Sequence, residues 1–174
     1  PPLFFFKLKR AYDLASCLVG SEMCIRDRTI SVELFGDNTI SISDNGRGIP
    51  IDSHPKFKNK SALEVIMTTL HSGGKFSNKN YTTSGGLHGV GASVVNALSS
   101  FLKVQVIRGG ILYKQEFSKG LPTTKLNEIE STKKSNGTSI LFKPDTSIFG
   151  ENNFFSPDKL FKILEYKAYL FGGV

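Results

Sequence analysis

Apolar and polar side chains alternate in two short segments that lie close together in the chain. Residues 30–34 read Ile-Ser-Val-Glu-Leu, and residues 40–42 resume the alternation after a Gly36-Asp37-Asn38 turn. A period of two is typical of a half-buried strand. A glycine-containing turn between two such segments predicts a β-hairpin.

Three later segments also alternate and are predicted to be strands. Two polar stretches, residues 54–60 and 118–136, carry no such pattern and are predicted to be loops. The predicted strands are residues 101–107, with Leu102, Val104 and Val106 on one face, residues 111–117 and residues 138–143.

Helical spacing of three and four occurs in three further segments. Ser61-Ala62-Leu63-Glu64 is a capping box that predicts a helix reaching about His71. A second helix is predicted from residue 90 to 98, and a third begins at Ser156-Pro157 and ends at Gly172-Gly173. The apolar residues expected to face the core are Leu63, Ile66, Met67 and Leu70, then Val90, Val94, Val95, Ala97 and Leu98. The third helix is continued by Leu160, Phe161, Leu164, Lys167 and Ala168.

The order of these elements predicts an α/β (α+β) fold, a two-layer sandwich of a mainly antiparallel sheet with helices on one face. Residues 1–28 show no comparable pattern, and the run SCLVGSEMCIRDR resembles a translated adapter or cloning remnant. We therefore predict that residues 29–174 form part of one domain, and we exclude residues 1–28 from the fold prediction.

The composition limits the function only loosely. The 174 residues include 22 Lys and Arg against 15 Asp and Glu, a net charge of +7 that favours an anionic partner. Cys17 and Cys24 have no metal-binding or redox spacing. No apolar run approaches the ~20 residues that a membrane span needs, so a soluble, cytoplasmic protein is expected.

The stretch SGGLHGVGASVVNALS, residues 84–99, places four glycines directly before a helical pattern. Glycine lets several backbone N–H groups approach one anion, and a helix N-terminus adds unpaired donors. The stretch predicts a phosphate cradle, although a surface loop followed by a core helix is an alternative. A Walker A loop is excluded because Gly-Lys-Ser/Thr is missing, and a Rossmann turn because no strand precedes the glycines.

Two other segments carry candidate chemistry. In DNGRGIP, Asp44 ends a predicted strand beside a bend formed by glycines and a proline, which predicts a fixed carboxylate. An ordinary turn-initiating aspartate is the alternative. Residues 72–83 are rich in Gly, Ser and Asn and carry Lys75 and Tyr81, which predicts a lid; an ordinary connecting loop is the alternative.

The motifs DNGRGIP, GGKFSNKNY and SGGLHGVGASVVNALS together resemble the ATPase domain of type IIA topoisomerase B subunits. Gyrase, heat-shock chaperones, histidine kinases and the MutL mismatch-repair proteins share this superfamily. The resemblance covers residues 29–174 and implies a Bergerat-type ATP-binding fold, truncated at both ends. The segments HPKFKNKSALEVIMTTLHSGGKFSNKNY and SPDKLFKILEYKAYLFGGV resemble the topoisomerase IV branch more closely than the gyrase branch.

The resemblance implies a role for each matching residue. Asp44 would accept a hydrogen bond from the adenine amino group, and Arg108 would lie at the pocket rim. The implied adenine-binding residues are Asp44, Arg47, Gly48, Ile49, Pro50, Tyr81 and Thr138. The implied phosphate-binding residues are Lys75 and, through the backbone, Gly86, Leu87, His88, Gly89, Val90, Gly91 and Ala92.

One part of the family pattern is missing. The family carries a Glu that activates the attacking water and, four residues later, an Asn that holds Mg²⁺. Here Glu22 is followed by Arg26, and no Asn precedes Asn38. The resemblance therefore implies ATP and Mg²⁺ as cofactors, but no catalytic residue within this chain, and we expect the chain itself to be inactive.

For the parent protein, the resemblance implies a type II DNA topoisomerase that relaxes or decatenates DNA. ATP binding would dimerise two such domains and close a clamp on double-stranded DNA, which a DNA-cleaving A subunit cuts. Two alternatives remain open at this point. One is another member of the superfamily, such as a histidine kinase or chaperone ATPase domain. The other is a non-catalytic nucleotide-sensing or DNA-binding module.

Overall fold

The described part of the computed structural model, residues 29–54, 57–70 and 90–170, contains one seven-stranded antiparallel sheet. Its order is β1-β2-β9-β5-β6-β7, and β8 also pairs with β6. The strands are β1 (Ile30–Leu34), β2 (Ile40–Asp44), β5 (Ser99–Arg108), β6 (Ile111–Ser118), β7 (Leu121–Pro122), β8 (Asn127–Ser131) and β9 (Gly137–Pro144). A separate hairpin pairs β3 (Ser53–His54) with β4 (Phe57–Ser61).

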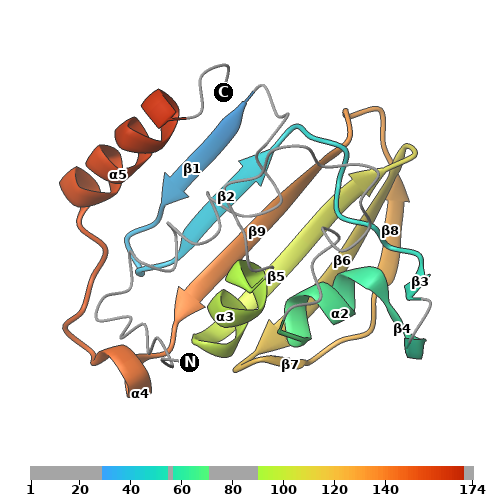
Figure 1. The fold of residues 1–174 in the computed structure, drawn as a ribbon, viewed down its shortest axis with the longest axis horizontal. Helices are drawn as coiled ribbons and strands as arrows, with labels where there is room; N and C mark the ends of the chain where they lie inside the picture. The colour runs from blue at the N-terminus through green and yellow to red at the C-terminus, as the bar shows by residue number, and fades with distance from the viewer. Residues whose placement is uncertain (1–28, 55–56, 71–89, 171–174) are drawn as a thin grey trace, which may run out of the picture.

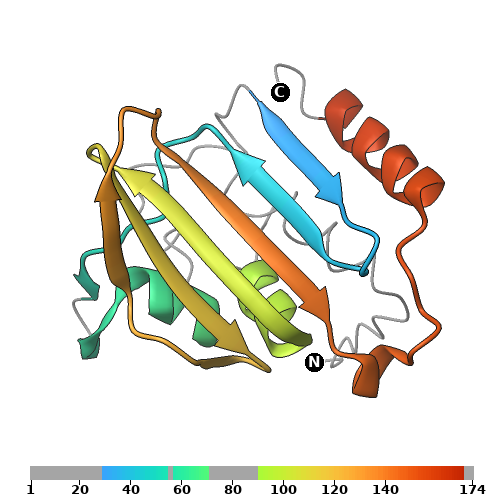
Figure 2. The ribbon, with the colours of Figure 1, turned by 180° about the vertical axis from the view of Figure 1, so that it is seen from behind.

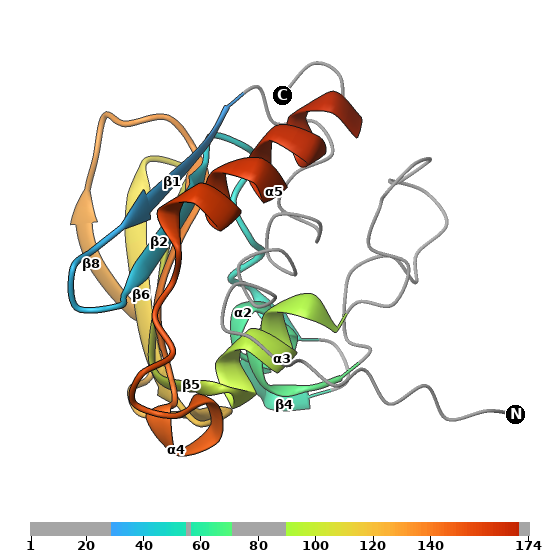
Figure 3. The same cartoon turned by 90° about the vertical axis from the view of Figure 1, so that its left-hand side faces the viewer.

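The longer helices lie on one side of the sheet. In Figure 1, α2 (Ala62–Thr68) and α3 (Gly91–Ala97) lie in front of the central strands, and α5 (Pro157–Leu170) lies beside β1. The edge-on view of Figure 3 places all three on the same side. In Figure 2 no helix of the described residues crosses in front of the opposite face. This arrangement is the predicted two-layer sandwich, and the short helix α4 (Thr146–Phe149) follows β9.

The core lies between the sheet and these helices. Alternate residues of the central strands are fully buried, and apolar side chains of α2, α3 and α5 cover them. Each buried aliphatic or aromatic side chain contributes about 1.5–3 kcal/mol. The main members are Ile40, Ile42, Leu63, Met67, Val95, Leu102, Val104, Val106, Phe117, Ile140, Phe142 and Leu160.

Several strands and a helix were not predicted. Residues 54–60 were expected to be a loop but overlap β3 and β4, and residues 118–136 contain β7 and β8. All five residues of β8 are exposed, so it pairs through its backbone without a buried face. A strand of this kind has no period-two pattern to detect. The four-residue helix α4 is too short for a helical pattern.

The predicted helix faces need correction. The helix α2 ends at Thr68 and not near His71, because Thr69 adopts an extended conformation. Leu70 is consequently 58% exposed, and Val65 is buried where Ile66 was expected. In α3 the expected core residue Ala97 is exposed, whereas the polar residue Asn96 is fully buried. His71 and Gly172-Gly173 lie outside the described residues.

Candidate functional site

Asp44 ends β2 and pairs with Thr138 of β9. Alternation places Asp44 on the same face as Ile40 and Ile42, which belong to the core beneath the helices. Its Oδ1 accepts a hydrogen bond from the Gly46 N–H at 2.9 Å, and its Oδ2 is shielded from solvent. Asp44 therefore initiates a turn, as the alternative interpretation predicted. The same hydrogen bond orients its carboxylate on the face of the sheet that the helices cover.

Gly48 fits closely against the neighbouring strands. Its φ is +77°, and a Cβ there would lie 2.9 Å from the Ile107 carbonyl oxygen and 3.0 Å from Val106 Cγ1. Only glycine adopts this positive φ so close to β5 without strain, because it has no Cβ. The next N–H, of Ile49, donates to Thr138 Oγ1 at 3.2 Å. The Gly48 bend is thereby joined to Thr138, which is 3% exposed.

Gly137 has a similar role that the sequence did not indicate. A Cβ at Gly137 would collide with the carbonyl oxygen of Asp44, since the two backbones approach closely there. Glycine at this position permits the strand pairing that sets Thr138 opposite Asp44. A single glycine at the start of a strand gives no signal that distinguishes it from a turn residue.

The predicted rim residues surround the same bend. Arg108 Nη1 donates to the Gly48 carbonyl oxygen at 3.1 Å, and this bond fixes the guanidinium at the end of β5. Ile49 packs against the core, whereas Arg47 and Pro50 are exposed. The structure thus brings together the predicted adenine-binding residues that it describes. Tyr81 lies outside the described residues.

The predicted phosphate-binding residues are described only in part. Val90 precedes α3, Gly91 begins it, and Ala92 packs against the core. No side chain caps the N-terminus of α3. Because Val95 of α3 belongs to the same core cluster as Ile42, α3 and the Asp44 carboxylate share one face of the sheet. The others, Lys75, Gly86, Leu87, His88 and Gly89, lie outside the described residues.

Asp37 and Asp145 have lowered pKa values, and both lie at the ends of β2 and β9 that are remote from Asp44 and Thr138. A hydrogen bond from the Thr39 hydroxyl lowers the pKa of Asp37. The Lys119 ammonium, 2.8 Å from Oδ2, lowers the pKa of Asp145, and the backbone N–H of Ser147 donates to Oδ1. These groups stabilise turns at the far end of the sheet.

Metal-binding clusters and membrane-spanning helices are both absent from residues 29–54, 57–70 and 90–170. No group of three or more His, Cys, Asp or Glu side chains in these ranges could hold a metal ion. No helix there is long and apolar enough to cross a membrane.

A cavity of about 590 Å³ lies beside the same strand ends. Its lining includes Asp44 and Thr138 and also Ser43, Gln105, Ile107, Leu112 and Ser139, and the last five alternate with the core positions of their strands. The alternating side chains therefore belong to the face of the sheet away from α2 and α3. We do not assign the nucleotide to this cavity, because alternation along β2 places the Asp44 side chain on the opposite, helix-covered face of the sheet.

Comparison with known proteins decides the family. The model of the histidine kinase-, DNA gyrase B- and HSP90-like ATPases matches residues 20–148, which is more than half of the chain. The chain belongs to this ATPase family. The match includes every residue predicted above to bind nucleotide.

Within the family, the chain is similar to topoisomerase B subunits. It is 57% identical over 145 residues to the B subunit of DNA topoisomerase 4 from Rickettsia bellii, covering 83% of this chain and 22% of that protein. It is 54% identical over 147 residues to the same protein of Caulobacter vibrioides, covering 84% and 21%. Against the B subunit of DNA gyrase from Thermotoga maritima the identity is 50% over 145 residues, covering 83% and 22%. The chain thus spans about a fifth of the length of these relatives.

A solved structure confirms the fold. The 43K ATPase domain of Thermus thermophilus gyrase B, described in complex with an aminocoumarin, superposes with a TM-score of 0.78 at 36% identity. The superposition covers 93% of this chain and 41% of that one. The predicted family and the predicted sandwich of an antiparallel sheet with helices are therefore correct. The roles of individual residues and the division at residue 28 stay predictions.

Proposed function

We propose that this chain binds ATP as part of the ATPase domain of a type II DNA topoisomerase B subunit. The observation that carries the proposal is the meeting of Asp44, Gly48 and Thr138 on the face of the sheet that α3 also covers. The similarity to topoisomerase B subunits and to the gyrase B ATPase domain supports it.

Asp44 recognises the base in this proposal. Its carboxylate accepts a hydrogen bond from the adenine amino group, whereas guanine would present a carbonyl oxygen at the same position. A hydrogen bond to a charged group contributes about 1.5–3 kcal/mol. The Gly46 N–H already orients the carboxylate, so little conformational freedom is lost on binding.

The remaining residues complete the pocket and hold the triphosphate. Gly48 and Thr138 contact the base, Arg47, Ile49 and Pro50 form the pocket wall, and Tyr81 reaches the base from residues 72–83. Backbone N–H groups of residues 86–92 and the Lys75 ammonium bind the phosphates. Mg²⁺ accompanies ATP in this proposal, but the described residues offer no ligand cluster for it, and we assign it no ligand.

For the parent protein we propose the activity that the topoisomerase relatives are named for. ATP binding brings two copies together and closes a clamp on double-stranded DNA, and a separate A subunit cleaves the DNA. Relaxation or decatenation follows from passage of one duplex through another, in the cytoplasm and on the nucleoid. The net charge of +7 is compatible with a DNA partner.

The 174-residue chain itself hydrolyses no ATP in this proposal, because no Glu-x-x-x-Asn precedes β1. That same observation favours the second candidate function, a module that binds nucleotide or DNA without catalysis. A steady ATPase rate from the purified chain that Asp44→Ala abolishes would contradict both statements.

Calorimetric titration with ATP tests the proposed site. We expect Asp44→Asn to weaken ATP binding by more than tenfold, because an amide cannot replace the charged acceptor with the same strength. Asp37→Asn is the matched control. Asp37 lies just before the first residue of β2, whereas Asp44 is its last residue, and Asp37 accepts a similar hydrogen bond from the Thr39 N–H at 3.2 Å. Unchanged affinity in Asp44→Asn, or equal losses in the two variants, would remove Asp44 from the site.

A further inference from the structure

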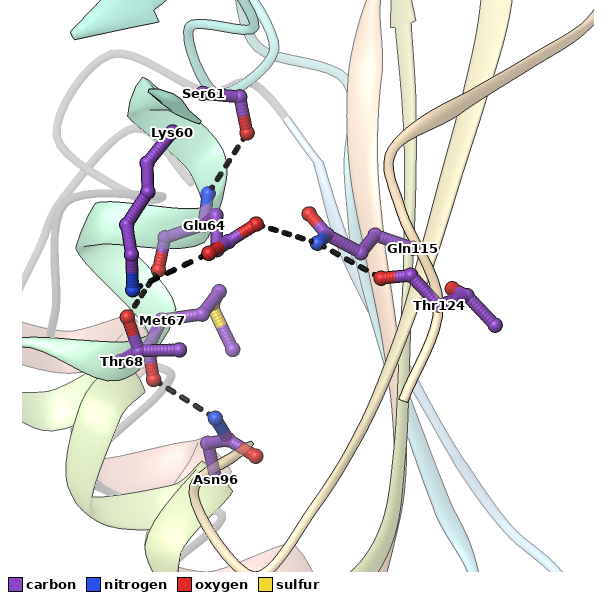
Figure 4. A network of polar contacts seen from close by, with 8 residues as sticks. All are labelled: Lys60, Ser61, Glu64, Met67, Thr68, Asn96, Gln115 and Thr124. Carbon is purple, nitrogen blue, oxygen red and sulfur yellow. Dashed lines mark hydrogen bonds and ion pairs between the residues drawn. The ribbon is translucent and has the colours of Figure 1, made fainter. Parts of the chain in front are cut away.

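A buried side chain joins the two short helices that cover the sheet. Asn96 of α3 donates through Nδ2 to the backbone carbonyl oxygen of Met67, in the last turn of α2, at 2.9 Å. Figure 4 shows Asn96 directed at the α2 backbone. Both residues are fully buried. This bond therefore joins α2 to α3, and residues 71–89 lie between these two helices in the sequence.

The helix α2 is itself bonded to the sheet. Gln115 of β6 donates through Nε2 to Glu64 Oε2 and to the Thr124 carbonyl oxygen, both at 3.1 Å (Figure 4). The second oxygen of Glu64 forms an ion pair with Lys60 at 3.3 Å. Since Gln115 is fully buried, this contact ties α2 to a fixed point in the core. A polar path therefore runs from β6 through α2 to α3.

The Asn96 contact is not explained by stability alone. Its Oδ1 is buried and finds no hydrogen-bond partner among the described residues. A buried acceptor without a donor is unfavourable, so burial of this amide carries a cost that its one hydrogen bond must offset. The contact does satisfy a carbonyl at the C-terminus of α2, where helices leave such groups unpaired. What the amide adds is a directed link between two helices of seven residues each, which are too short to be stable alone.

We propose that Asn96 is a positioning residue for the triphosphate half of the nucleotide site. This inference rests on the proposed function, in which Val90, Gly91 and Ala92 belong to the phosphate-binding loop. Asn96 lies one turn further along α3 and fixes that helix relative to α2. The proposed adenine residues are instead positioned by the pairing of β2 with β9. Loss of the Asn96 bond therefore loosens the phosphate loop and leaves the base contacts in place.

The two halves of the ligand can be tested separately with the full chain. ATP and adenosine affinities are measured by NMR titration for the wild type and for Asn96→Leu, which removes the donor and keeps the branched shape of the side chain. We expect ATP binding to weaken about tenfold and adenosine binding to change by less than twofold. Ser99→Ala is the matched control: Ser99 is equally buried, and its hydroxyl bonds the Val95 carbonyl oxygen at 2.6 Å without linking α2 to α3. It should leave both affinities within twofold.

Two results would overturn the inference: equal losses for ATP and adenosine, or no loss for either. Asn96→Ala, which removes the same donor without adding bulk, repeats the measurement if leucine is not accommodated. Failure of both variants to fold, judged by circular dichroism, would also overturn it, because the bond would then serve the fold. A wild-type chain that binds neither ligand would instead contradict the proposed function.

Discussion

The sheet and the helices position their parts of the candidate site in different ways. Asp44 and Thr138 are set opposite each other by backbone pairing, and close approach of glycine backbones fixes the adjoining bend. The helices α2 and α3 are held instead by side-chain bonds from Gln115 and Asn96. The proposed adenine half of the site therefore depends on strand register, whereas the proposed phosphate half depends on a few long-range polar contacts.

The largest expected effect comes from breaking the strand register. Gly137→Ala places a methyl group against the Asp44 carbonyl oxygen, so the β2–β9 pairing must shift. We expect a loss of about 3 kcal/mol in the free energy of unfolding, measured by urea titration. Gly36→Ala is the control, because a Cβ there meets nothing within 4 Å, and it should change stability by less than about 1 kcal/mol. Equal effects of the two substitutions would show that the register is not constrained at Gly137.

A smaller loss is expected when α2 is released from the sheet. Gln115→Leu removes the donor to Glu64 and to the Thr124 carbonyl oxygen. The Glu64 side chain is only 17% exposed, so we expect a loss of about 2 kcal/mol in the free energy of unfolding. Gln105→Leu is the matched control, because Gln105 lies on the opposite face and is only half-buried. If Gln115→Leu were as well tolerated as this control, the contact would not hold α2.

The segment before α5 is also attached through a side chain, and this attachment provides a third test. Asn38, in the β1–β2 turn, accepts a hydrogen bond from the Phe155 N–H at 2.8 Å and donates to the Asn153 carbonyl oxygen at 3.1 Å. Asn38→Gly keeps the positive φ of 67° accessible but removes both bonds. We expect a loss of about 1 kcal/mol, with faster amide hydrogen exchange in α5 than in β2. Uniform exchange in the two elements would contradict this attachment.

The smallest effect concerns acid stability at the far end of the sheet. The Lys119 ammonium lowers the pKa of Asp145 in the folded state. A lowered pKa stabilises the fold above the ordinary value of 3.8, and this contribution disappears as the pH falls through the folded-state pKa. We expect Lys119→Met to raise the pKa of Asp145 toward its ordinary value in a carboxyl NMR titration. The variant should also lose less stability than the wild type between pH 5 and about pH 3, and identical pH profiles would contradict the assignment.

Local patterns predicted the strands that carry the proposed adenine-binding residues. The alternation in β1, β2, β5, β6 and β9 is clear because the side chains that face the core are mostly apolar and those between them are mostly polar. The bend at Asp44 was visible from its glycines and proline. Strand pairing sets the position of Thr138 relative to Asp44, but the pairing of β2 with β9, which are far apart in the chain, was not predicted.

The polar contacts between helices could not be predicted in this way. Asn96 lies within an apolar helical segment, and nothing in that pattern indicates that it reaches Met67, 29 positions earlier. Gln115 occupies a core position of β6 that the alternation alone would assign to an apolar residue. Leu70 was expected to be buried because the helical spacing continues past Thr68, where the backbone becomes extended. Each of these features depends on tertiary contacts that local spacing does not encode.

A crystal structure of the chain with a non-hydrolysable ATP analogue would show directly whether Asp44 binds the adenine. The decisive quantity is the distance from the adenine amino nitrogen to the Asp44 carboxylate. We expect a hydrogen bond of about 2.7–3.2 Å, with the triphosphate directed toward α3. An adenine bound on the opposite face of the sheet, in the cavity beside Gln105, would show that Asp44 does not recognise the base in the proposed way.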